Sequence, residues 1–392
     1  MRTTGIAMLM ATALSSTAAA ATAPAATEPE MERLAARFEQ VLRRVHADYV
    51  DAVPGERLVE AAIEGMLASL DPHSVFLDQA AAQAQQERTS GKFGGIGIKV
   101  APDEGGLRIL APIDGGPAAR AGLRGGDLVT RIDGEPVGDA GLAETTRRIR
   151  GQVGTRVTLT VLRDGPGAPG SFDVTLTRAV VRASSVTHRV EGTVGYIRIH
   201  SFDAQAQRGL DKAVAAIGAE LGGRLPDGYV LDLRDNPGGL VRQAVSVADS
   251  FLEAGTIVSI RARDAAPRVH EAQPGDISHG LPLAVLINGG SASSSEIVTG
   301  ALQDHGRAIV LGTRSFGKGS VQTVASLGDW GAVKLTTARY YTPSGRSIHA
   351  VGIEPDVEVP PDRGTGSDDR QLAHALALVR TGPVMASAMA GP

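Results

Sequence analysis

The sequence contains no cysteine among its 392 residues, and it has little aromatic character, with one tryptophan and 3% Phe, Tyr and Trp in total. The absence of cysteine excludes disulfides, thiolate metal ligands and a cysteine nucleophile, and it is compatible with an oxidising compartment. Because aromatic side chains are scarce, we expect a core of Val, Ile, Leu and Ala. The 49 glycines predict many turns.

A strong charge of either sign is also missing. Lys and Arg number 39 against 43 Asp and Glu, which gives a formal net charge of -4, and the basic residues are scattered along the chain. This balance offers no electrostatic case for a nucleic-acid partner. The length allows two or three domains, and the 42% hydrophobic and 21% charged residues are those of an ordinary globular protein.

No apolar run reaches the roughly 20 residues that span a bilayer. Residues 1–26 contain one arginine, a short apolar run and then Ala-x-Ala sequences, which is the layout of a secretory signal peptide. We therefore expect the segment to be removed and the mature protein to occupy the periplasm or another exported cell-envelope space. A disordered alanine-rich tail is the alternative reading.

Residues 28–90 have the apolar periodicity of helices. Leu34, Phe38 and Val41 recur at three- and four-residue steps, and a second run of this kind covers residues 56–70. The Asp-Pro pair at positions 71 and 72 ends it. Packing alone is sufficient to explain both apolar faces.

Residues 91–180 change to short strands with glycine-rich turns, and this segment resembles a PDZ domain. Its sequence AGLRGGDLVTRIDGEPV is the most recognisable PDZ stretch. A glycine-rich loop that ends in a strand offers free N–H groups to a chain-terminal carboxylate, and the bound peptide then adds to the sheet edge. A small β-barrel without a ligand is the alternative. The residues that match the carboxylate-binding loop are Gly95, Ile96, Gly97 and Ile98.

Residues 184–360 alternate strand-like and helix-like stretches, which predicts an α/β domain with a mostly parallel sheet. Ligands in such sheets bind beyond the carboxyl ends of the strands. Three glycine-rich or serine-rich motifs follow predicted strands: NPGG, GGSASSS and SFGKGS. Their convergence on one sheet edge would form an active site. Residues 361–392 read as a polar linker, a C-terminal helix and a tail.

Three familiar catalytic patterns fit poorly. The G-x-x-x-x-G-K string that ends at Lys318 resembles a phosphate-binding loop, but Gly319 replaces the Mg²⁺-binding hydroxyl and strands follow instead of a helix. The S-x-x-K string that starts at Ser315 lacks S-D-N and K-T-G partners. Asp304 and His305 would complete a triad with a serine only from a few helical turns away, and no G-x-S-x-G elbow occurs.

A fourth pattern pairs a serine of NGGSASSSEIV with Lys318 as its general base. The lysine pKa must then fall from roughly 10.4 to about 7–8, which costs about 4 kcal/mol and requires a water-poor site. Phe316 and the flanking glycines suggest such surroundings, and Gln322, four residues on, would orient the amine. A serine at the helix N-terminus meets a positive dipole and free N–H groups. N-capping and a solvated loop lysine are the plain alternatives; the capping candidates are Ser291, Ser293, Ser294 and Ser295.

The motifs together resemble those of one family. SLDPHSVFL, the PDZ segment, LDLRDNPGG, GGSASSSEI, SFGKGSVQT and GIEPDV occur in the order seen in C-terminal processing peptidases, also called tail-specific proteases, over about residues 30–380. The resemblance implies that Ser293 is the nucleophile, Lys318 the general base and Gln322 the residue that positions it. It also implies backbone oxyanion donors at Gly238 or Gly239 and at Ser294, where the family often has alanine.

This resemblance implies an α/β, mostly parallel-sheet peptidase core with an inserted PDZ domain and an N-terminal helical region. The implied activity is that of a serine endopeptidase that recognises apolar C-terminal tails of exported proteins and needs no metal and no cofactor. An adaptor protein or a homodimer formed through the N-terminal helices are implied partners. The alternative is a non-catalytic PDZ scaffold that binds protein C-termini in the cell envelope.

Overall fold

The computed structural model describes residues 27–361 and 369–381, apart from residues 114, 139–140, 166–169 and 183. The expected signal peptide, polar linker and tail therefore lie outside the described residues. The chain forms two compact units, residues 1–69 and 70–392. Within the described ranges, no helix has the length and apolar character needed to cross a membrane.

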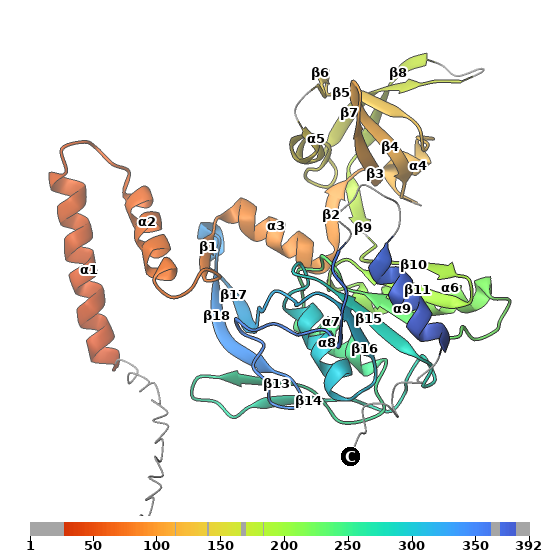
Figure 1. Ribbon diagram of the computed structural model, residues 1–392. Helices are drawn as coiled ribbons and strands as arrows, with labels where there is room; N and C mark the ends of the chain where they lie inside the picture. The colour runs from red at the N-terminus through yellow and green to blue at the C-terminus, as the bar shows by residue number, and fades with distance from the viewer. Residues whose placement is uncertain are drawn as a thin grey trace, which may run out of the picture. The chain divides into compact units, whose positions relative to one another are not determined.

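From residue 27 to residue 69 the first unit contains two helices, α1 (Glu28–Asp48) and α2 (Gly55–Ala68), which confirms the helical periodicity read there (Figure 1). An apolar stripe runs along α1, yet none of the residues of α1 is buried. Its members, which we call the α1 stripe, are exposed by about half: Met31, Leu34, Phe38, Val41 and Val45. The sequence prediction of a helical face was thus correct, but this face is not covered in the described chain.

The second unit begins before the strand-rich segment. A short strand, β1 (Val75–Leu77), and a third helix, α3 (Gln79–Ser90), come first. Asp78 caps α3 by accepting a hydrogen bond from the Ala81 N–H at 2.7 Å, and Gly91 ends it with φ 66°. The Asp-Pro pair lies just beyond α2, where the sequence predicted a helix break.

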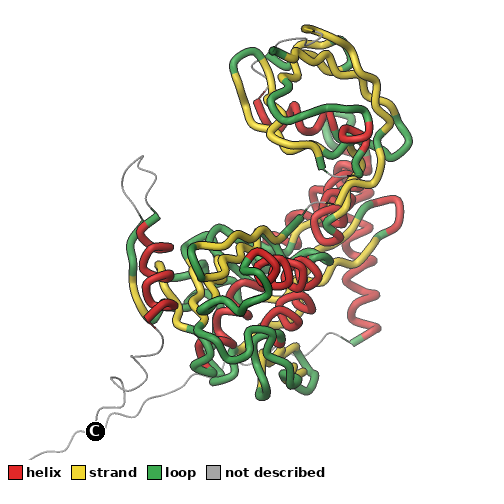
Figure 2. The backbone as a smooth tube through the Cα atoms, turned by 90° about the vertical axis from the view of Figure 1, so that its right-hand side faces the viewer, coloured by secondary structure: helices red, strands yellow, loops and turns green. Residues whose placement is uncertain are grey.

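The segment that resembles a PDZ domain is built mostly of strands, as the upper part of Figure 2 shows. Five strands form one antiparallel sheet, and a sixth, short strand pairs with β5. Its core includes Ile109, Val129 and Leu159, all fully buried. A two-stranded ribbon of β2 (Lys92–Gly95) and β9 (Ala179–Arg182) flanks the segment at both ends in sequence. The other elements are β3 (Ile98–Asp103), β4 (Gly106–Pro112), α4 (Pro117–Arg120), β5 (Leu128–Ile132), β6 (Glu135–Pro136), α5 (Gly141–Ile149), β7 (Arg156–Arg163) and β8 (Gly170–Thr177).

The α/β region has a six-stranded sheet in the order β10-β11-β12-β15-β16-β19. Only the β10–β11 pair is antiparallel, so the expectation of a mostly parallel sheet is confirmed. The strands are β10 (Val186–Glu191), β11 (Val194–Ile199), β12 (Tyr229–Asp232), β15 (Leu283–Ile287), β16 (Ile309–Gly312) and β19 (Val357–Glu358). The helices are α6 (Ala206–Glu220), α7 (Val241–Asp249), α8 (Ser294–Asp304) and α9 (Arg370–Thr381).

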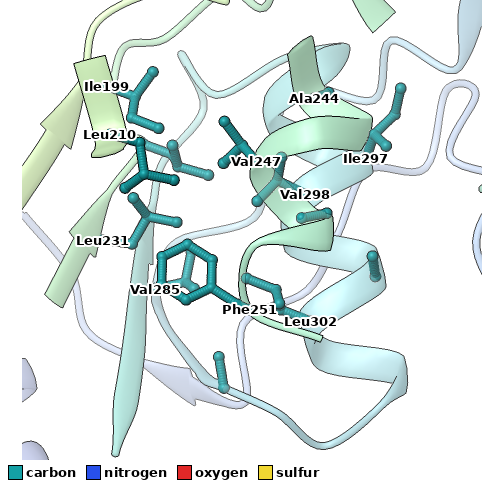
Figure 3. Packing of buried hydrophobic residues seen from close by; sticks show 14 of the residues in the cluster. Ile199, Leu210, Leu231, Ala244, Val247, Phe251, Val285, Ile297, Val298 and Leu302 are labelled. Atoms are coloured by element: carbon teal, nitrogen blue, oxygen red, sulfur yellow. The ribbon is translucent and has the colours of Figure 1, made fainter. Parts of the chain in front are cut away.

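Alternation along the central strands builds a core on each face of this sheet. Val285 and Ile287 of β15 join the cluster formed with α6, α7 and α8 (Figure 3). The intervening Ala284 and Leu286 join a second cluster with α9. The strand therefore reads as a continuous apolar run, as expected for a strand covered on both faces.

A second, five-stranded antiparallel sheet packs beside the α/β layers, and the sequence did not predict it as a separate sheet. Its long strand β18 pairs with three others, β1, β13 and β17. Its last strand, β14, pairs with β13. A short 3₁₀ helix, Gly328–Trp330, precedes β18. The strands not yet given are β13 (Thr256–Ala262), β14 (Arg268–Glu271), β17 (Ser320–Ser326) and β18 (Ala332–Tyr341).

Candidate active site

Ser293 lies at the turn between β15 and α8, at the carboxyl end of a central parallel strand. Its backbone has φ 58° and ψ -112°, a conformation that a residue with a side chain rarely adopts. A strained strand-to-helix turn that exposes a serine is the nucleophile elbow of α/β hydrolases. The small residues that such an elbow requires on either side are here serines, Ser291 and Ser295, both fully buried. The elbow therefore exists without the G-x-S-x-G string.

The flanking serines fasten the elbow to the turn that follows β12. The Ser291 hydroxyl donates to the Leu233 carbonyl at 2.8 Å, and the Ser295 hydroxyl donates to the Asn236 carbonyl at 2.8 Å. These hydroxyls bond a neighbouring loop, so N-capping alone does not describe them. Two of the three motifs expected at the sheet edge are thus in direct contact.

The predicted oxyanion donors lie at this junction. The Gly238 N–H donates to the side chain of Asn236 at 2.9 Å, whereas the N–H groups of Gly239 and Ser294 meet no hydrogen-bond acceptor among the described residues. Gly239 is therefore the better placed of the two glycines. Gly238 still matters sterically, because a Cβ there would lie 2.7 Å from the Cβ of Ser293. The Ser294 hydroxyl donates to the Gly239 carbonyl at 3.1 Å.

Lys318 lies in the loop between β16 and β17, and its side chain is partly buried. Burial lowers the pKa of the Lys318 amine, and the Lys334 ammonium lowers it further. The carboxylates of Asp71 and Glu296 act in the opposite direction on that pKa. Within the described chain, no hydrogen bond to the Lys318 amine is observed. The expectation that Phe316 shields it is wrong, because the Phe316 side chain is 61% exposed.

Gln322 lies on β17, while Lys318 precedes the strand. The argument that the two share one strand face therefore does not apply here. The Gln322 amide nitrogen donates to the hydroxyls of Ser320 at 2.8 Å and Thr336 at 3.2 Å. These bonds fix the orientation of the amide and leave its oxygen for another donor. Its contact with Lys318 stays a prediction.

Sequence reasoning missed Tyr340, which contacts the candidate nucleophile directly. Its hydroxyl lies 2.9 Å from the Ser293 hydroxyl, and the side chain is fully buried. Burial raises the pKa of Tyr340 to about 12, so the phenol stays protonated at neutral pH. The two residues are far apart in sequence, and only the packing of β18 beside α8 brings them together. The sequence contained no signal for this contact.

Glu296 was also missed as a functional residue, although it stands three positions after Ser293 in a Ser-x-x-Glu string. The side chain is fully buried. One carboxylate oxygen accepts from the N–H groups of Ser293 at 2.7 Å and Lys318 at 2.8 Å. The other accepts from the Ser315 hydroxyl at 2.5 Å and the Gly317 N–H at 2.7 Å. A single carboxylate thus joins the elbow to the lysine loop.

The segment SLDPHSVFL contributes a third part of the surroundings. Asp71 accepts hydrogen bonds from the N–H groups of His73 at 2.8 Å and Ser74 at 2.9 Å. The Ser74 hydroxyl in turn accepts from the Thr336 N–H on β18 at 3.1 Å. Burial lowers the pKa of His73, and the charge of Lys318 lowers it further. This segment, read from the sequence as a helix break and as a family motif without an assigned role, therefore lies close to Lys318.

The alternative triad is contradicted by the structure. Asp304 lies at the far end of α8 and pairs with Arg346, and it accepts from the Ser344 N–H at 2.9 Å. The His305 ring contacts the Thr256 carbonyl at 2.7 Å. At about 1.5 Å per residue, an eleven-residue helix separates this pair from Ser293 by about 16 Å.

The loop expected to bind a carboxylate connects β2 to β3. Ile96 is buried, and Gly97 has φ 75°. The carbonyl of Ile96 accepts from the Ala118 N–H at 2.9 Å, and that of Gly97 accepts from the Ile113 N–H at 2.8 Å. These bonds tie the loop to the segment before and within α4. Its ability to bind a C-terminal carboxylate stays a prediction.

Comparisons with known proteins agree with this organisation. The model of peptidase family S41 matches residues 193–359, a PDZ domain model matches residues 94–175, and the model of the activating protease CtpB N-terminal domain matches residues 4–81.

Individual relatives share much of the chain. A carboxy-terminal-processing protease of Bartonella bacilliformis is 46% identical over 325 residues, which are 83% of this chain and 74% of the relative. A probable CtpA-like serine protease of Staphylococcus aureus is 36% identical over 332 residues, 82% of this chain and 64% of the relative. The solved structure of a photosystem II D1 C-terminal processing protease is 30% identical with a TM-score of 0.50, and the match covers 88% of this chain and 97% of that one. The chain therefore belongs to peptidase family S41, as a carboxy-terminal-processing serine protease with a PDZ domain.

Proposed function

We propose that this protease cleaves exported proteins near apolar C-terminal tails, using Ser293 as nucleophile and Lys318 as general base. The observation that supports the dyad is the Glu296 oxygen, which accepts a hydrogen bond from the backbone of both residues. Two residues that are distant in sequence therefore lie side by side at the carboxyl edge of the sheet. Ser293 stands beside the N–H groups of Gly239 and Ser294, which are suited to an oxyanion.

The proposed reaction has two stages. The Ser293 oxygen attacks the scissile carbonyl carbon while the Lys318 amine takes the hydroxyl proton. The oxyanion accepts from the N–H groups of Gly239 and Ser294, the C–N bond breaks, and the Lys318 ammonium protonates the leaving amine. Lys318 then takes a proton from water, which attacks the acyl ester; the ester C–O bond breaks, and the Lys318 ammonium returns that proton to the released Ser293 oxygen. Neither stage requires a metal or a cofactor.

Tyr340 is compatible with this chemistry. A serine hydroxyl donates one hydrogen bond and accepts two. Because the phenol of Tyr340 stays protonated, it can donate to the Ser293 oxygen while that hydroxyl donates to Lys318. The phenol would then stabilise the serine oxygen as its proton leaves.

The dyad is tested with purified mature enzyme and an unstructured substrate that has an apolar tail. Ser293→Ala and Lys318→Ala should each abolish cleavage, while Lys212→Ala, on the exposed face of α6, should cleave like the parent. Cleavage by both dyad variants at the parent rate would show that the dyad is wrong. If the parent protein is folded and binds the tail but does not cleave the substrate, the non-catalytic scaffold is favoured.

We assign tail recognition to the PDZ loop from Gly95 to Ile98. A chain-terminal carboxylate would accept from N–H groups of this loop, and an apolar last residue would add contact area. Amidation of the substrate C-terminus removes the charge and should raise KM with little change in kcat. An unchanged KM would contradict the proposal that the PDZ domain binds the C-terminal carboxylate of the substrate.

The α1 stripe supports a further part of the proposal, namely a homodimer or an adaptor complex. Apolar side chains at i, i+3 and i+4 spacing along one exposed helix face are typical of helix pairing. Phe38→Asp should shift the sedimentation coefficient towards the monomer, whereas Gln40→Asp, off the stripe, should leave it unchanged. A monomeric parent would contradict the homodimer and leave the adaptor to be tested by binding.

The exported location rests on residues 1–26 and on the absence of cysteine. Deletion of these residues should retain the protein in the cytoplasm when cells are fractionated. A periplasmic protein after that deletion would contradict the signal-peptide assignment.

A further inference from the structure

We infer that Glu296 is a positioning residue of this active site, which holds the nucleophile and the general base in register and stabilises the ammonium of Lys318 after proton transfer. The inference rests on the proposed dyad and adds a third group to it. Neither an N-cap nor a core-packing role accounts for its full set of contacts.

Glu296 holds the two backbones together by its geometry. The Glu296 side chain extends from the first turn of α8, and one of its two carboxylate oxygens accepts from the N–H groups of Ser293 and Lys318. The two backbone nitrogens therefore cannot be farther apart than two hydrogen bonds laid end to end. The second oxygen fixes the lysine loop through Ser315 and Gly317. A loop with glycine on both sides of its lysine would otherwise have many conformations.

The hydrogen-bond partners of Glu296 favour its charged form. All four of its partners donate, so the ionised carboxylate is the form that satisfies them, and a protonated acid would place an O–H against a donor. Burial raises the pKa of Glu296, and the hydrogen bonds from Ser315 and from backbone N–H groups oppose that rise. Four hydrogen-bond donors offset the free-energy cost of burying the charged carboxylate.

The negative charge of Glu296 also acts on the amine of Lys318. A carboxylate near an amine favours its ammonium form, and the Glu296 charge raises the pKa of Lys318. The carboxylate of a serine protease triad stabilises the imidazolium in the same way. Burial and the neighbouring Lys334 lower the pKa of Lys318 and so favour the neutral amine, while the Glu296 charge raises that pKa and favours the ammonium formed by proton transfer.

The experiment compares Glu296→Gln, Glu296→Asp and Asp276→Asn. Asp276 is the matched control, because it is a buried carboxylate with hydrogen bonds from Ser278, Gly280 and Arg307, away from the site. Each variant is measured for thermal stability, for kcat and KM between pH 5 and pH 10, and for the pKa of Lys318. The last is obtained from the pH dependence of acetylation by acetic anhydride, read by peptide mass spectrometry.

Glu296→Gln should lower kcat by about 100-fold with little change in KM, the size of effect expected when reacting groups shift by about 1 Å. Because the variant lacks the negative charge, the pKa of Lys318 should fall, and the acid limb of the activity profile should move to lower pH. Glu296→Asp keeps the negative charge but has a shorter side chain that cannot reach the lysine loop as well. We therefore expect kcat to fall while the pKa of Lys318 stays near that of the parent. Asp276→Asn should lose stability alone.

A folded Glu296→Gln enzyme with the kcat and the Lys318 pKa of the parent would overturn the inference. If that variant does not fold, Ser315→Ala replaces it. Removal of one of four donors should lower kcat without changing KM, and parent-like kcat in a stable Ser315→Ala enzyme would equally overturn it. Cleavage by Lys318→Ala at the parent rate would instead remove the dyad itself, so the two failures are distinguishable.

Discussion

At the scale of single residues, the electrostatics of Lys318 arise from competing neighbours. Burial and Lys334 lower the pKa of its amine, while Asp71 and Glu296 raise it. The proposed general-base role requires the neutral amine, so kcat/KM should rise as pH increases through the pKa of Lys318. The pH at which kcat/KM rises therefore measures how the neighbouring charges shift the pKa of Lys318.

We predict that Lys334→Gln shifts the acid limb of the kcat/KM profile to higher pH. The substitution removes a nearby positive charge, the pKa of Lys318 rises, and less of the amine is neutral at a given pH. This is the opposite of the shift expected for Glu296→Gln. Lys212→Gln is the control on a distant exposed helix face. A limb that moves to lower pH in Lys334→Gln would contradict the assignment of Lys318 as base.

Tyr340→Phe should lower kcat by about 5- to 10-fold, which corresponds to the roughly 1 kcal/mol net value of one hydrogen bond. The ring that fills the core is kept, and only the hydroxyl that contacts Ser293 is lost. Tyr341→Phe, the next residue on β18, is the control. An unchanged kcat for Tyr340→Phe would mean that the phenol has only a packing role.

Gly238→Ala should reduce kcat by about 100-fold or more, because a misplaced reacting group costs this much. The new methyl would lie 2.7 Å from the Ser293 Cβ and 2.7 Å from the Ala292 carbonyl oxygen, so the elbow must move. Gly223→Ala is a matched control, since its φ of 82° is also positive but no atom lies within 4 Å of the added Cβ. Both variants should lose about 1 kcal/mol of stability from backbone strain. Only Gly238→Ala should lose activity.

At the scale of elements, the parallel strands and the loops at their carboxyl ends could be predicted, because continuous apolar runs such as the one ending at Ile287 alternate with helical periodicity. The elbow at Ser293 could be placed between a strand and a helix for the same reason. The strained backbone of Ser293 could not be predicted, because Ser291 and Ser295 stand where the two glycines of the G-x-S-x-G string usually indicate a nucleophile elbow. The Tyr340 contact depends on the packing of a second sheet, and no local pattern encodes that packing.

The ion pairs of Arg234, which connect β12 to the residue before helix α9, give a prediction about stability. Arg234 donates to Asp232 at 2.6 Å and to Asp369, just before α9, at 2.7 Å. Because Asp232 is fully buried, Arg234→Ala leaves a carboxylate without its main partner and should cost about 3–5 kcal/mol. Chemical unfolding measures this loss. Arg208→Ala, on an exposed position of α6, should stay within about 0.5 kcal/mol of the parent.

At the scale of the whole molecule, the family could be recognised because its motifs are contiguous strings in a fixed order. Two roles that those strings do not reveal required coordinates: Glu296 as a carboxylate bonded to two loops, and Tyr340 as a contact of Ser293. Glu296 stands inside the GGSASSSEI string, yet its partners Gly317 and Lys318 belong to another motif. A sequence shows that both motifs are present, but only the fold shows that one carboxylate connects them.

The proposed active site draws its groups from two sheets: Ser293 follows a strand of the parallel one, and Tyr340 stands on the antiparallel one. The loop of Lys318 runs from one to the other. Slight parting of these layers would separate the reacting atoms while each layer keeps its own hydrogen bonds. On heating, turnover should therefore fail several degrees before the circular dichroism signal changes, and cooling should restore it.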